Sequence, residues 1–355
     1  REMLTLQNVI DSIKEPDQEA ADLARRRWDS VAKPLNSLGA LERDLVRIAG
    51  VQGTPRISIG SKAIVVMCAD NGIVEEGVTQ TGQEVTAIVA EHMGDGTSCV
   101  CRMAAVAGAK VVPVDIGIAG ETSSPGILRM KVACGTRNFL KEPAMSRRET
   151  VQALETGIAV AGEMSRRGFA LLGSGEMGIG NTTTSSAVLS VLLEQPPSRV
   201  TGRGAGLDTT SYRRKISVIE EGIRLRRPDK GDGIDVLSKV GGLDLAGLAG
   251  LYLGCAYYGI PVVLDGLICA AAALAAVRIC PAVGGYLLAS HVSAEPAGAM
   301  ALEALGLEPA INAGMCLGEG TGAAALFPLL DMAFAVYDGM STFGEMQVEQ
   351  YQPLK

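Results

Sequence analysis

Apolar residues along the chain form short continuous runs that alternate with longer stretches at helical spacing. The short runs predict buried strands at residues 62–70, 110–115, 169–172, 261–265, 285–290 and, more weakly, 309–313. Helical spacing predicts helices over 17–32, 38–48, from 83, 97–107, 149–166, 183–194, through 215, 243–258, after 265 and 323–337. This alternation predicts an α/β fold with a mostly parallel, doubly wound sheet.

Three further features refine this picture. Pro113 lies within the second strand and predicts that this strand is near a sheet edge, because proline lacks the N–H that a ladder needs. Residues 117–148 have no clear period and predict an irregular excursion. The uncharged run 245–264 is long enough for a membrane span, but Pro261 interrupts it, so we expect a buried helix followed by a core strand.

Polar side chains stand at or near the last apolar residues of the predicted strands. Because the carboxyl ends of parallel strands meet at one edge of a sheet, and ligands bind there, we expect these side chains to cluster. They are Asp70, Asp115, Ser174 with Glu176, Asp265, and Ser290 with His291.

A glycine-rich stretch links the strand at 169–172 to the helix that follows. Its glycines, at 173, 175, 178 and 180, permit positive φ and close approach to a ligand, and Asn181 or Thr182 can cap a helix whose N-terminus favours an anion. The stretch matches neither the Walker A loop nor the dinucleotide fingerprint. The glycines alone favour a plain tight turn, but a carboxylate at Glu176 beside an anion site costs stability and so points to a function.

Composition excludes several classes of protein. The net charge of -7 and the pI near 5.1 argue against a nucleic-acid partner. Eight cysteines occur without a Cys-x-x-Cys pair and with two histidines, which argues against zinc and for small buried thiols in a reducing cytosol. Residues 1–14 contain no signal-peptide core, so we expect a cytoplasmic protein.

The segment 175–183, Gly-Glu-Met-Gly-Ile-Gly-Asn-Thr-Thr, resembles the signature of the nicotinate-nucleotide:dimethylbenzimidazole phosphoribosyltransferase family. Similar stretches follow that family's order at 33–42, 135–139, 143–145, 202–208, 241–246, 290–295 and 317–322. The resemblance implies a Rossmann-like catalytic domain over 56–322 and a small helical domain built from both chain ends, 1–55 and 323–355. It also implies a homodimer that needs no cofactor and no metal.

The resemblance further implies a reaction and a set of site residues. A 5-phosphoribosyl group would pass from nicotinate mononucleotide to 5,6-dimethylbenzimidazole or a related base, with inversion at the anomeric carbon. Glu319 would be the catalytic base and Glu176 the second important acid. The aromatic base would contact Thr79, Gln83, Met177 and Leu317, and the mononucleotide Gly178, Gly180, Asn181, Thr182, Lys215, Asp265, Ser293 and Gly320.

The residues by themselves leave other interpretations open. Glu319 fits a plain turn, Lys215 a solvated helix face and Asp265 a helix cap, while Met177 and Leu317 fit a core as well as a pocket. A dehydrogenase would need the dinucleotide fingerprint, and a transport component would need 245–264 as one helix.

The aromatic-base loop departs from the family pattern at three positions. Asn71, Thr79 and Gly82 stand where the family commonly has histidine, serine and proline. These departures leave benzimidazole, adenine and a phenol as alternative acceptors.

Overall fold

The computed structural model describes residues 4–204 and 206–352, so the outermost residues of the predicted segments 1–55 and 323–355 lie outside it. Its strands form one six-stranded, all-parallel sheet in the order β3-β2-β1-β4-β5-β6. They are β1 (Lys62–Ala69), β2 (Ala109–Gly117), β3 (Leu128–Arg129), β4 (Leu171–Met177), β5 (Val262–Leu264) and β6 (Leu287–Ala289). The predicted α/β class with a parallel sheet is confirmed.

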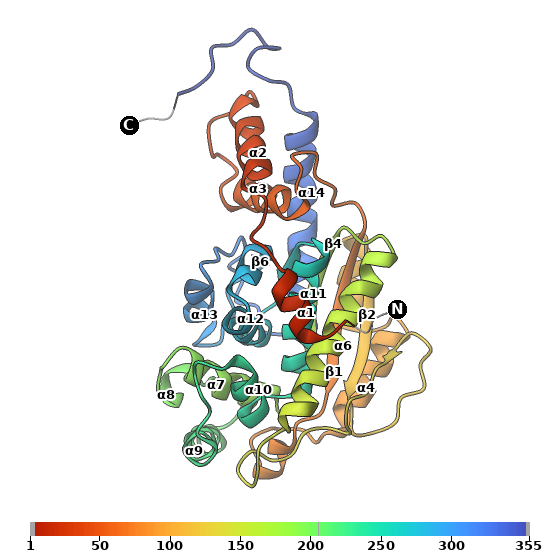
Figure 1. Cartoon of the computed structure of the whole chain (residues 1–355), viewed down its shortest axis with the longest axis vertical. Coiled ribbons are helices and arrows are strands. Elements are labelled where there is room, and N and C mark those ends of the chain that lie inside the picture. The colour runs from red at the N-terminus through yellow and green to blue at the C-terminus, as the bar shows by residue number, and fades with distance from the viewer. Residues whose placement is uncertain (1–3, 205, 353–355) are drawn as a thin grey trace.

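Helices connect the strands and cover both faces of the sheet (Figure 1). They are α1 (Leu6–Ser12), α2 (Gln18–Ser30), α3 (Ala40–Gln52), α4 (Glu84–Gly94), α5 (Cys99–Val106), α6 (Arg147–Arg166), α7 (Asn181–Leu192), α8 (Pro197–Val200), α9 (Thr209–Arg226), α10 (Gly233–Val240), α11 (Leu243–Tyr258), α12 (Leu267–Ile279), α13 (Gly298–Leu305) and α14 (Thr321–Gly339). Two 3₁₀ helices, η1 (Gly72–Glu76) and η2 (Pro281–Tyr286), complete the described elements.

Strand β1 shows why both faces need cover. Val65 and Met67 point into the apolar cluster formed with α6 and α11, whereas Ile64, Val66 and Cys68 point into the cluster formed with α5 and α14. All five side chains are fully buried. A strand with both faces buried is a continuous apolar run rather than an alternating one, which is the pattern that the sequence displays.

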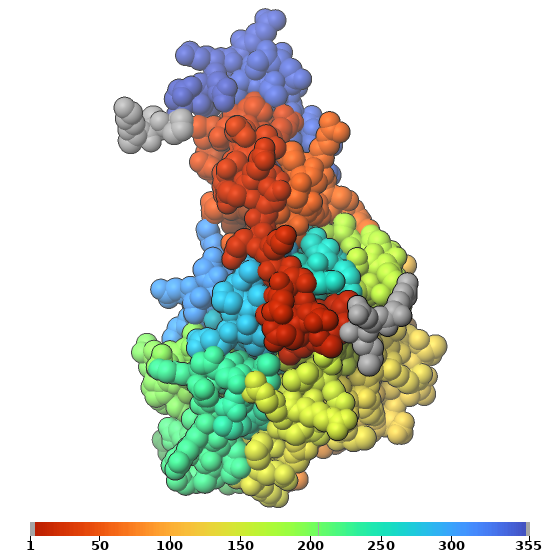
Figure 2. All heavy atoms as spheres, viewed as in Figure 1, coloured from red at the N-terminus to blue at the C-terminus, as the bar shows by residue number. Residues whose placement is uncertain are grey.

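Segments from the two ends of the chain lie side by side. The Trp28 ring of α2 packs edge-on against Tyr337 of α14 with ring centroids 5.2 Å apart, and Ala32 N donates to Ser341 O. Figures 1 and 2 show α2, α3 and the end of α14 gathered at one end of the molecule. Helix α1 differs, because it contacts α6 and α11 and Leu6 N donates to Glu155 Oε1 over 3.0 Å.

The central strand is longer than the sequence pattern predicts. β4 runs from Leu171 to Met177, so the glycines at 173 and 175 lie within the strand and not in a turn after residue 172. They are glycines because other elements approach closely: a Cβ at Gly173 would lie 2.6 Å from Ala323 Cβ, and one at Gly175 2.5 Å from Glu319 C. The spacing of apolar residues along the sequence does not reveal such contacts between distant elements.

The prediction of a side-chain cap on the next helix is wrong. Helix α7 begins at Asn181, its N-cap is Gly180 with φ 93°, and no side chain caps it. Asn181 and Thr182 instead lie in its first turn, where Asn181 Nδ2 donates to a carboxylate and Thr182 Oγ1 accepts from a lysine.

Other boundaries also differ from the sequence prediction. Residues 309–313 form no strand but a single parallel bridge, His291 to Ile311. The excursion 117–148 contains the short edge strand β3, which pairs only with Val114 and Asp115 of β2. Pro113 therefore has β1 on one side and no ladder partner in β3, so its predicted position near the edge is confirmed.

The uncharged run 245–264 is divided as predicted. Helix α11 ends at Tyr258, Gly259 adopts φ 69°, and β5 begins at Val262. Across residues 4–204 and 206–352, no helix has both the length and the apolar character needed to cross a membrane.

Helices α6 and α11 cross at glycines, which generates a testable prediction. A Cβ at Gly157 of α6 would lie 2.5 Å from Leu251 N of α11. Gly157→Ala should therefore lower the free energy of unfolding by about 1–3 kcal/mol, because the helices must separate, although alanine is the better helix former by about 1 kcal/mol. Gly339→Ala at the end of α14, where a Cβ meets no atom, is the matched control. Denaturant unfolding measures both, and equal stability of the two variants would contradict close packing.

Candidate active site

A cavity of about 320 Å³ opens where β4, β5 and β6 end. Its wall combines the end of β4 and the N-terminus of α7 with residues at 78–81, 203–204, 207, 265–269, 291–295 and 316–319. The structure brings together most of the predicted site residues. Those that line the cavity are Thr79, Glu176, Met177, Gly178, Gly180, Asn181, Thr182, Lys215, Asp265, Ser293, Leu317 and Glu319.

Two predicted residues do not line the cavity and act on residues around it instead. Gln83 Nε2 donates to Asn71 O over 3.1 Å. Gly320 is the N-cap of α14, and its N–H donates to Asp265 Oδ2 over 2.9 Å. Direct substrate contact by these two residues therefore stays a prediction.

Glu176 is a buried carboxyl group within a network of polar side chains. Asn181 Nδ2 donates to Glu176 Oε2, and the buried Asp244 lies close enough for its charge to raise the pKa of Glu176. Burial raises the pKa of Glu176 to about 8 and that of Asp244 to about 6. At neutral pH Glu176 therefore keeps its proton, and a neutral carboxyl can stand beside an anionic substrate without repelling it.

Glu319 is held in an unusual backbone conformation. Its φ is 62°, and the flanking Gly318 and Gly320 have φ of 90° and 88°. Left-handed backbone at a glutamate costs of order 1–3 kcal/mol and is typical of functional sites. Burial raises the pKa of Glu319, and the charge of Asp265 raises it further. Its Oε2 is buried without a hydrogen-bond partner in the described chain, so this carboxylate is available to a proton donor.

Lys215 supplies the positive charge of the cavity's other part. Its side chain is 1% exposed, and Nζ donates to Thr182 Oγ1 over 2.9 Å and to Gly202 O over 3.2 Å. Burial lowers the pKa of Lys215 to about 8, and the neighbouring Glu295 opposes this. The ammonium thus lies beside the first turn of α7, where free N–H groups and the helix dipole also favour an anion.

The strand-end prediction is correct in part. Glu176, Asp265 and His291 meet at the cavity, but Asp70, Asp115, Ser174 and Ser290 do not line it. Asp70 and Asp115 instead accept N–H bonds from residues 119 and 118, which follow β2. Ser174 lies deeper in the sheet against Tyr252 OH, and Ser290 Oγ donates to Leu264 O. The cavity forms at β4 to β6, and the ends of β1 and β2 are used for loop anchoring.

Comparison with known proteins identifies the family of this chain. A family model described as Phosphoribosyltransferase matches residues 13–348. A relative from Acetivibrio thermocellus named nicotinate-nucleotide–dimethylbenzimidazole phosphoribosyltransferase is 47% identical over 97% of this chain and 98% of its own. One of the same name from Escherichia coli strain SE11 is 45% identical over 95% and 94%. The crystal structure of CobT from Thermus thermophilus superposes with a TM-score of 0.89 at 39% identity, covering 94% of this chain and 100% of that one.

The chain belongs to the nicotinate-nucleotide–dimethylbenzimidazole phosphoribosyltransferase family. The resemblance seen in the segment 175–183 is thereby confirmed, and the matched range covers the other similar stretches.

Several residues of this phosphoribosyltransferase cavity were not predicted. Within the stretches that carried the resemblance, Arg203, Gly204 and Glu295 line the cavity, and Leu267 follows Asp265. The motifs at 202–208 and 290–295 contained the signal, but a motif does not state which of its residues face inward. Asp244, whose charge raises the pKa of Glu176, lies in the predicted motif 241–246 in the same way.

The cysteines correct one expectation. Cys68, Cys255, Cys269 and Cys280 are buried, but Cys99, Cys134 and Cys316 are exposed, so thiols are not uniformly internal. All eight are free, and no cluster of three or more metal-binding side chains occurs within the described residues.

The raised pKa of Glu176 predicts how stability depends on pH. The folded protein holds this proton up to about pH 8, whereas the ordinary pKa is 4.5, so stability falls as pH rises between these values. Glu176→Gln removes that cost, because the amide never ionises. The midpoint of thermal unfolding should therefore rise, relative to the parent protein, more near pH 8 than near pH 4.5. Glu303→Gln on the exposed side of α13 controls for net charge. An equal change at both pH values would refute a buried proton on Glu176.

Proposed function

We propose that this chain transfers the 5-phosphoribosyl group of nicotinate mononucleotide to 5,6-dimethylbenzimidazole or a related base, giving α-ribazole 5′-phosphate and nicotinate. The names of the relatives state a nicotinate nucleotide as the donor and dimethylbenzimidazole as the acceptor. The structural observation that supports it is one cavity that joins a buried lysine beside a helix N-terminus to a glutamate with an unpartnered oxygen.

The phosphate end of the proposed site is at Lys215 and the first turn of α7. One phosphate accepts hydrogen bonds from Lys215 and from backbone N–H groups of the turn that ends at Gly180. Lys215 thereby takes the place of the lysine that a Walker loop would carry. Asp265 and Ser293, which also line the cavity, are proposed to contact the ribose and the pyridine ring. The proposed mononucleotide contacts are Gly178, Gly180, Asn181, Thr182, Lys215, Asp265, Ser293 and Gly320.

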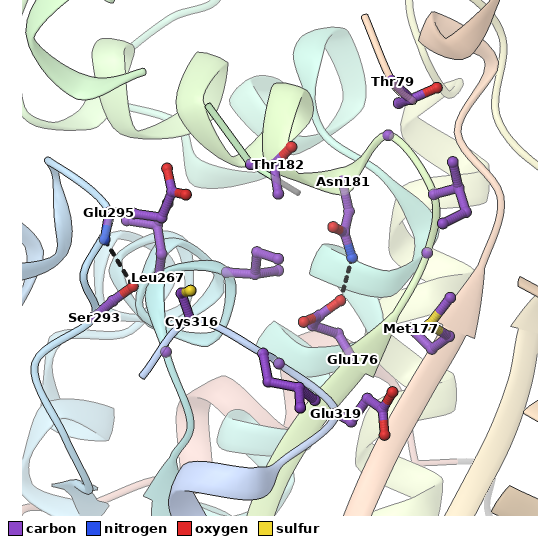
Figure 3. A pocket seen from close by; sticks show the side chains of 18 of the residues that line it. Thr79, Glu176, Met177, Asn181, Thr182, Leu267, Ser293, Glu295, Cys316 and Glu319 are labelled. Atoms are coloured by element: carbon purple, nitrogen blue, oxygen red, sulfur yellow. Dashed lines mark hydrogen bonds between the residues drawn. The ribbon is translucent and has the colours of Figure 1, made fainter. Parts of the chain in front are cut away.

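The acceptor end is proposed at Thr79, Gln83, Met177 and Leu317. In Figure 3, Thr79 and Met177 lie to one side of the Glu176–Asn181 pair, and Ser293 and Glu295 lie to the other. Apolar atoms of Met177 and Leu317 suit the flat, methylated face of a benzimidazole. The departures at Asn71, Thr79 and Gly82 keep adenine and a phenol as alternative acceptors for the same reaction.

The proposed chemistry assigns different roles to the two acids. The pyridinium nitrogen of the mononucleotide is already positive and leaves as neutral nicotinate nitrogen, so the leaving group needs no proton. The acceptor nitrogen gains positive charge on attack unless its partner N–H loses a proton, and Glu319 takes that proton. Attack opposite the leaving group inverts the anomeric carbon through an oxocarbenium-like state. Glu176, protonated at neutral pH, stands between the two ends.

Glu319→Gln should abolish turnover while both substrates still bind. Glutamine keeps the size and hydrogen bonding of the side chain but cannot accept the acceptor's proton, so kcat should fall ~10²–10⁴-fold. Steady-state nicotinate release and calorimetric binding of each ligand measure the two effects. Glu176→Gln is run in parallel as the rival base. Normal turnover in Glu319→Gln with loss in Glu176→Gln would reverse the two roles.

Lys215→Ala should weaken binding of nicotinate mononucleotide far more than binding of the free aromatic base. A lost charge-assisted contact to phosphate costs about 1.5–3 kcal/mol. Arg213→Ala, an exposed cation on the same helix, is the control for net charge. Equally weakened binding of both ligands would show that Lys215 does not contact the phosphate.

The protein is further proposed to be a homodimer. Large apolar side chains are exposed on neighbouring elements: Ile88 of α4 at 53%, Val106 of α5 at 86%, Met332 of α14 at 59%, and Leu317 beside the cavity at 54%. Association of two copies would cover such surface. Light scattering should give twice the monomer mass at micromolar concentration, and a monomeric mass there would disprove the dimer.

We propose the domain division expected from the sequence. Residues 56–322 form the Rossmann-like, doubly wound catalytic domain, and 1–55 with 323–355 form the small helical domain. The strand order, which reverses direction between β1 and β4, and the packing of α2 and α3 with α14 support this division. Helix α1 is the exception, because it packs on α6 and α11. The cytoplasmic location stays a prediction.

A further inference from the structure

The loop that carries Glu319 is strained and needs support from outside. Gly318, Glu319 and Gly320 all have positive φ. Such a conformation persists only when surrounding groups hold it in place. Locally, Thr321 closes the turn, since its N–H and its Oγ1 both donate to Gly318 O over 3.1 and 2.8 Å.

Asp265 provides support from a distant part of the chain. Its Oδ2 accepts from Gly320 N over 2.9 Å and its Oδ1 accepts from Gly322 N over 2.8 Å. These N–H groups belong to the N-cap and the second residue of α14, whose first N–H groups have no partner within the helix. Both N–H groups come directly after Glu319 in the chain, so the two bonds hold the start of α14, to which the Glu319 loop is joined.

Asp265 is itself rigidly placed. It is 3% exposed and follows β5 directly, and β5 is paired with β4 on one side and β6 on the other. Helix α14 has no side-chain cap of its own at Gly320. A carboxylate from β5 therefore takes the role that a capping side chain usually fills, and the dipole of a 19-residue helix favours its negative charge.

We propose that Asp265 is a positioning residue, which acts on the reaction by holding the Glu319 loop in its reactive geometry. The inference rests on the proposed role of Glu319 as the base, and it goes beyond the proposed contact of Asp265 with the mononucleotide. Both carboxylate oxygens are already engaged by backbone N–H groups. Misplacing a catalytic group by about 1 Å can cost ~10²-fold in rate, so loss of this anchor acts on turnover.

The variant Asp265→Asn tests the proposal. Asparagine has the same size, but its amide nitrogen cannot accept, so one of the two N–H groups loses its bond. We expect kcat to fall roughly 10–100-fold, while calorimetric binding of nicotinate mononucleotide and of dimethylbenzimidazole changes by less than about threefold. The matched control is Asp115→Asn, a buried aspartate of β2 that accepts Ile118 N and lies outside the cavity, and it should leave kcat unchanged.

A pH profile separates positioning from a general loss of folded protein. The charge of Asp265 raises the pKa of Glu319, so its removal lowers that pKa. A base works when deprotonated, and the acidic limb of log kcat against pH should therefore move to lower pH in Asp265→Asn. A smaller fraction of active enzyme would lower the curve without moving it, and that outcome would count against the proposal.

Two other outcomes overturn it. If Asp265→Asn weakens mononucleotide binding tenfold or more and leaves kcat intact, Asp265 binds substrate and does not position Glu319. Should that variant fail to fold, amide hydrogen exchange in the parent protein decides, because Gly320 and Gly322 must exchange at least ~10²-fold more slowly than free amides if Asp265 holds them. Exchange of the Gly320 and Gly322 amides at the rate of free amides would show that Asp265 does not hold them. Glu319→Gln distinguishes this proposal from the proposed function. Normal turnover in Glu319→Gln would refute the role of Glu319 as the base. An inactive Glu319→Gln together with a normal kcat in Asp265→Asn would refute only the positioning role of Asp265.

Discussion

The close contact between strand β4 and the loop before α14 is the constraint on which the site depends. A Cβ at Gly175 would lie 2.5 Å from Glu319 C, and one at Gly318 would lie 2.5 Å from Glu176 Oε1. The backbone of β4 can approach the backbone of Glu319 this closely because residue 175 is glycine, and Gly318 leaves room for the Glu176 carboxyl. This contact brings two acids from distant parts of the chain to one cavity, and it places the start of α14 over the central strand.

Desolvation then decides what each charged group does. Glu176, Asp244, Asp265 and Glu319 are drawn out of water together, and burial is the first cause of the raised pKa of each. A protonated Glu176 reduces the repulsion among them, so that Glu319 can stay available as a base. Lys215 and the N-terminus of α7 supply positive charge at the other end. This change from cation to carboxylate across the cavity matches the two proposed substrates, with the phosphate of the mononucleotide at Lys215 and the N–H of the acceptor base at Glu319.

Much of this arrangement could be predicted without coordinates. Continuous apolar runs identified β1, β2, β5 and β6 within a few residues, because strands buried on both faces admit no polar positions. The geometry of parallel sheets predicted that Glu176 and Asp265 would meet, and most of the residues that the motif resemblance named do line the cavity. Helices α1, α8, α10 and α13 were not predicted, since short helices carry too few periodic positions to stand out.

The sequence by itself determined the fold class, the family and the residue types at the site, because apolar period and local motifs are properties of adjacent residues. Only the tertiary structure decided that Gly173 and Gly175 belong to the strand, that Asp70 anchors a loop, and that Asp265 caps a helix from another part of the chain. Each of these depends on which distant atoms come within contact, and on the water that those atoms exclude. The raised pKa of Glu176 has the same origin, since burial is a property of the assembled core and not of the residue.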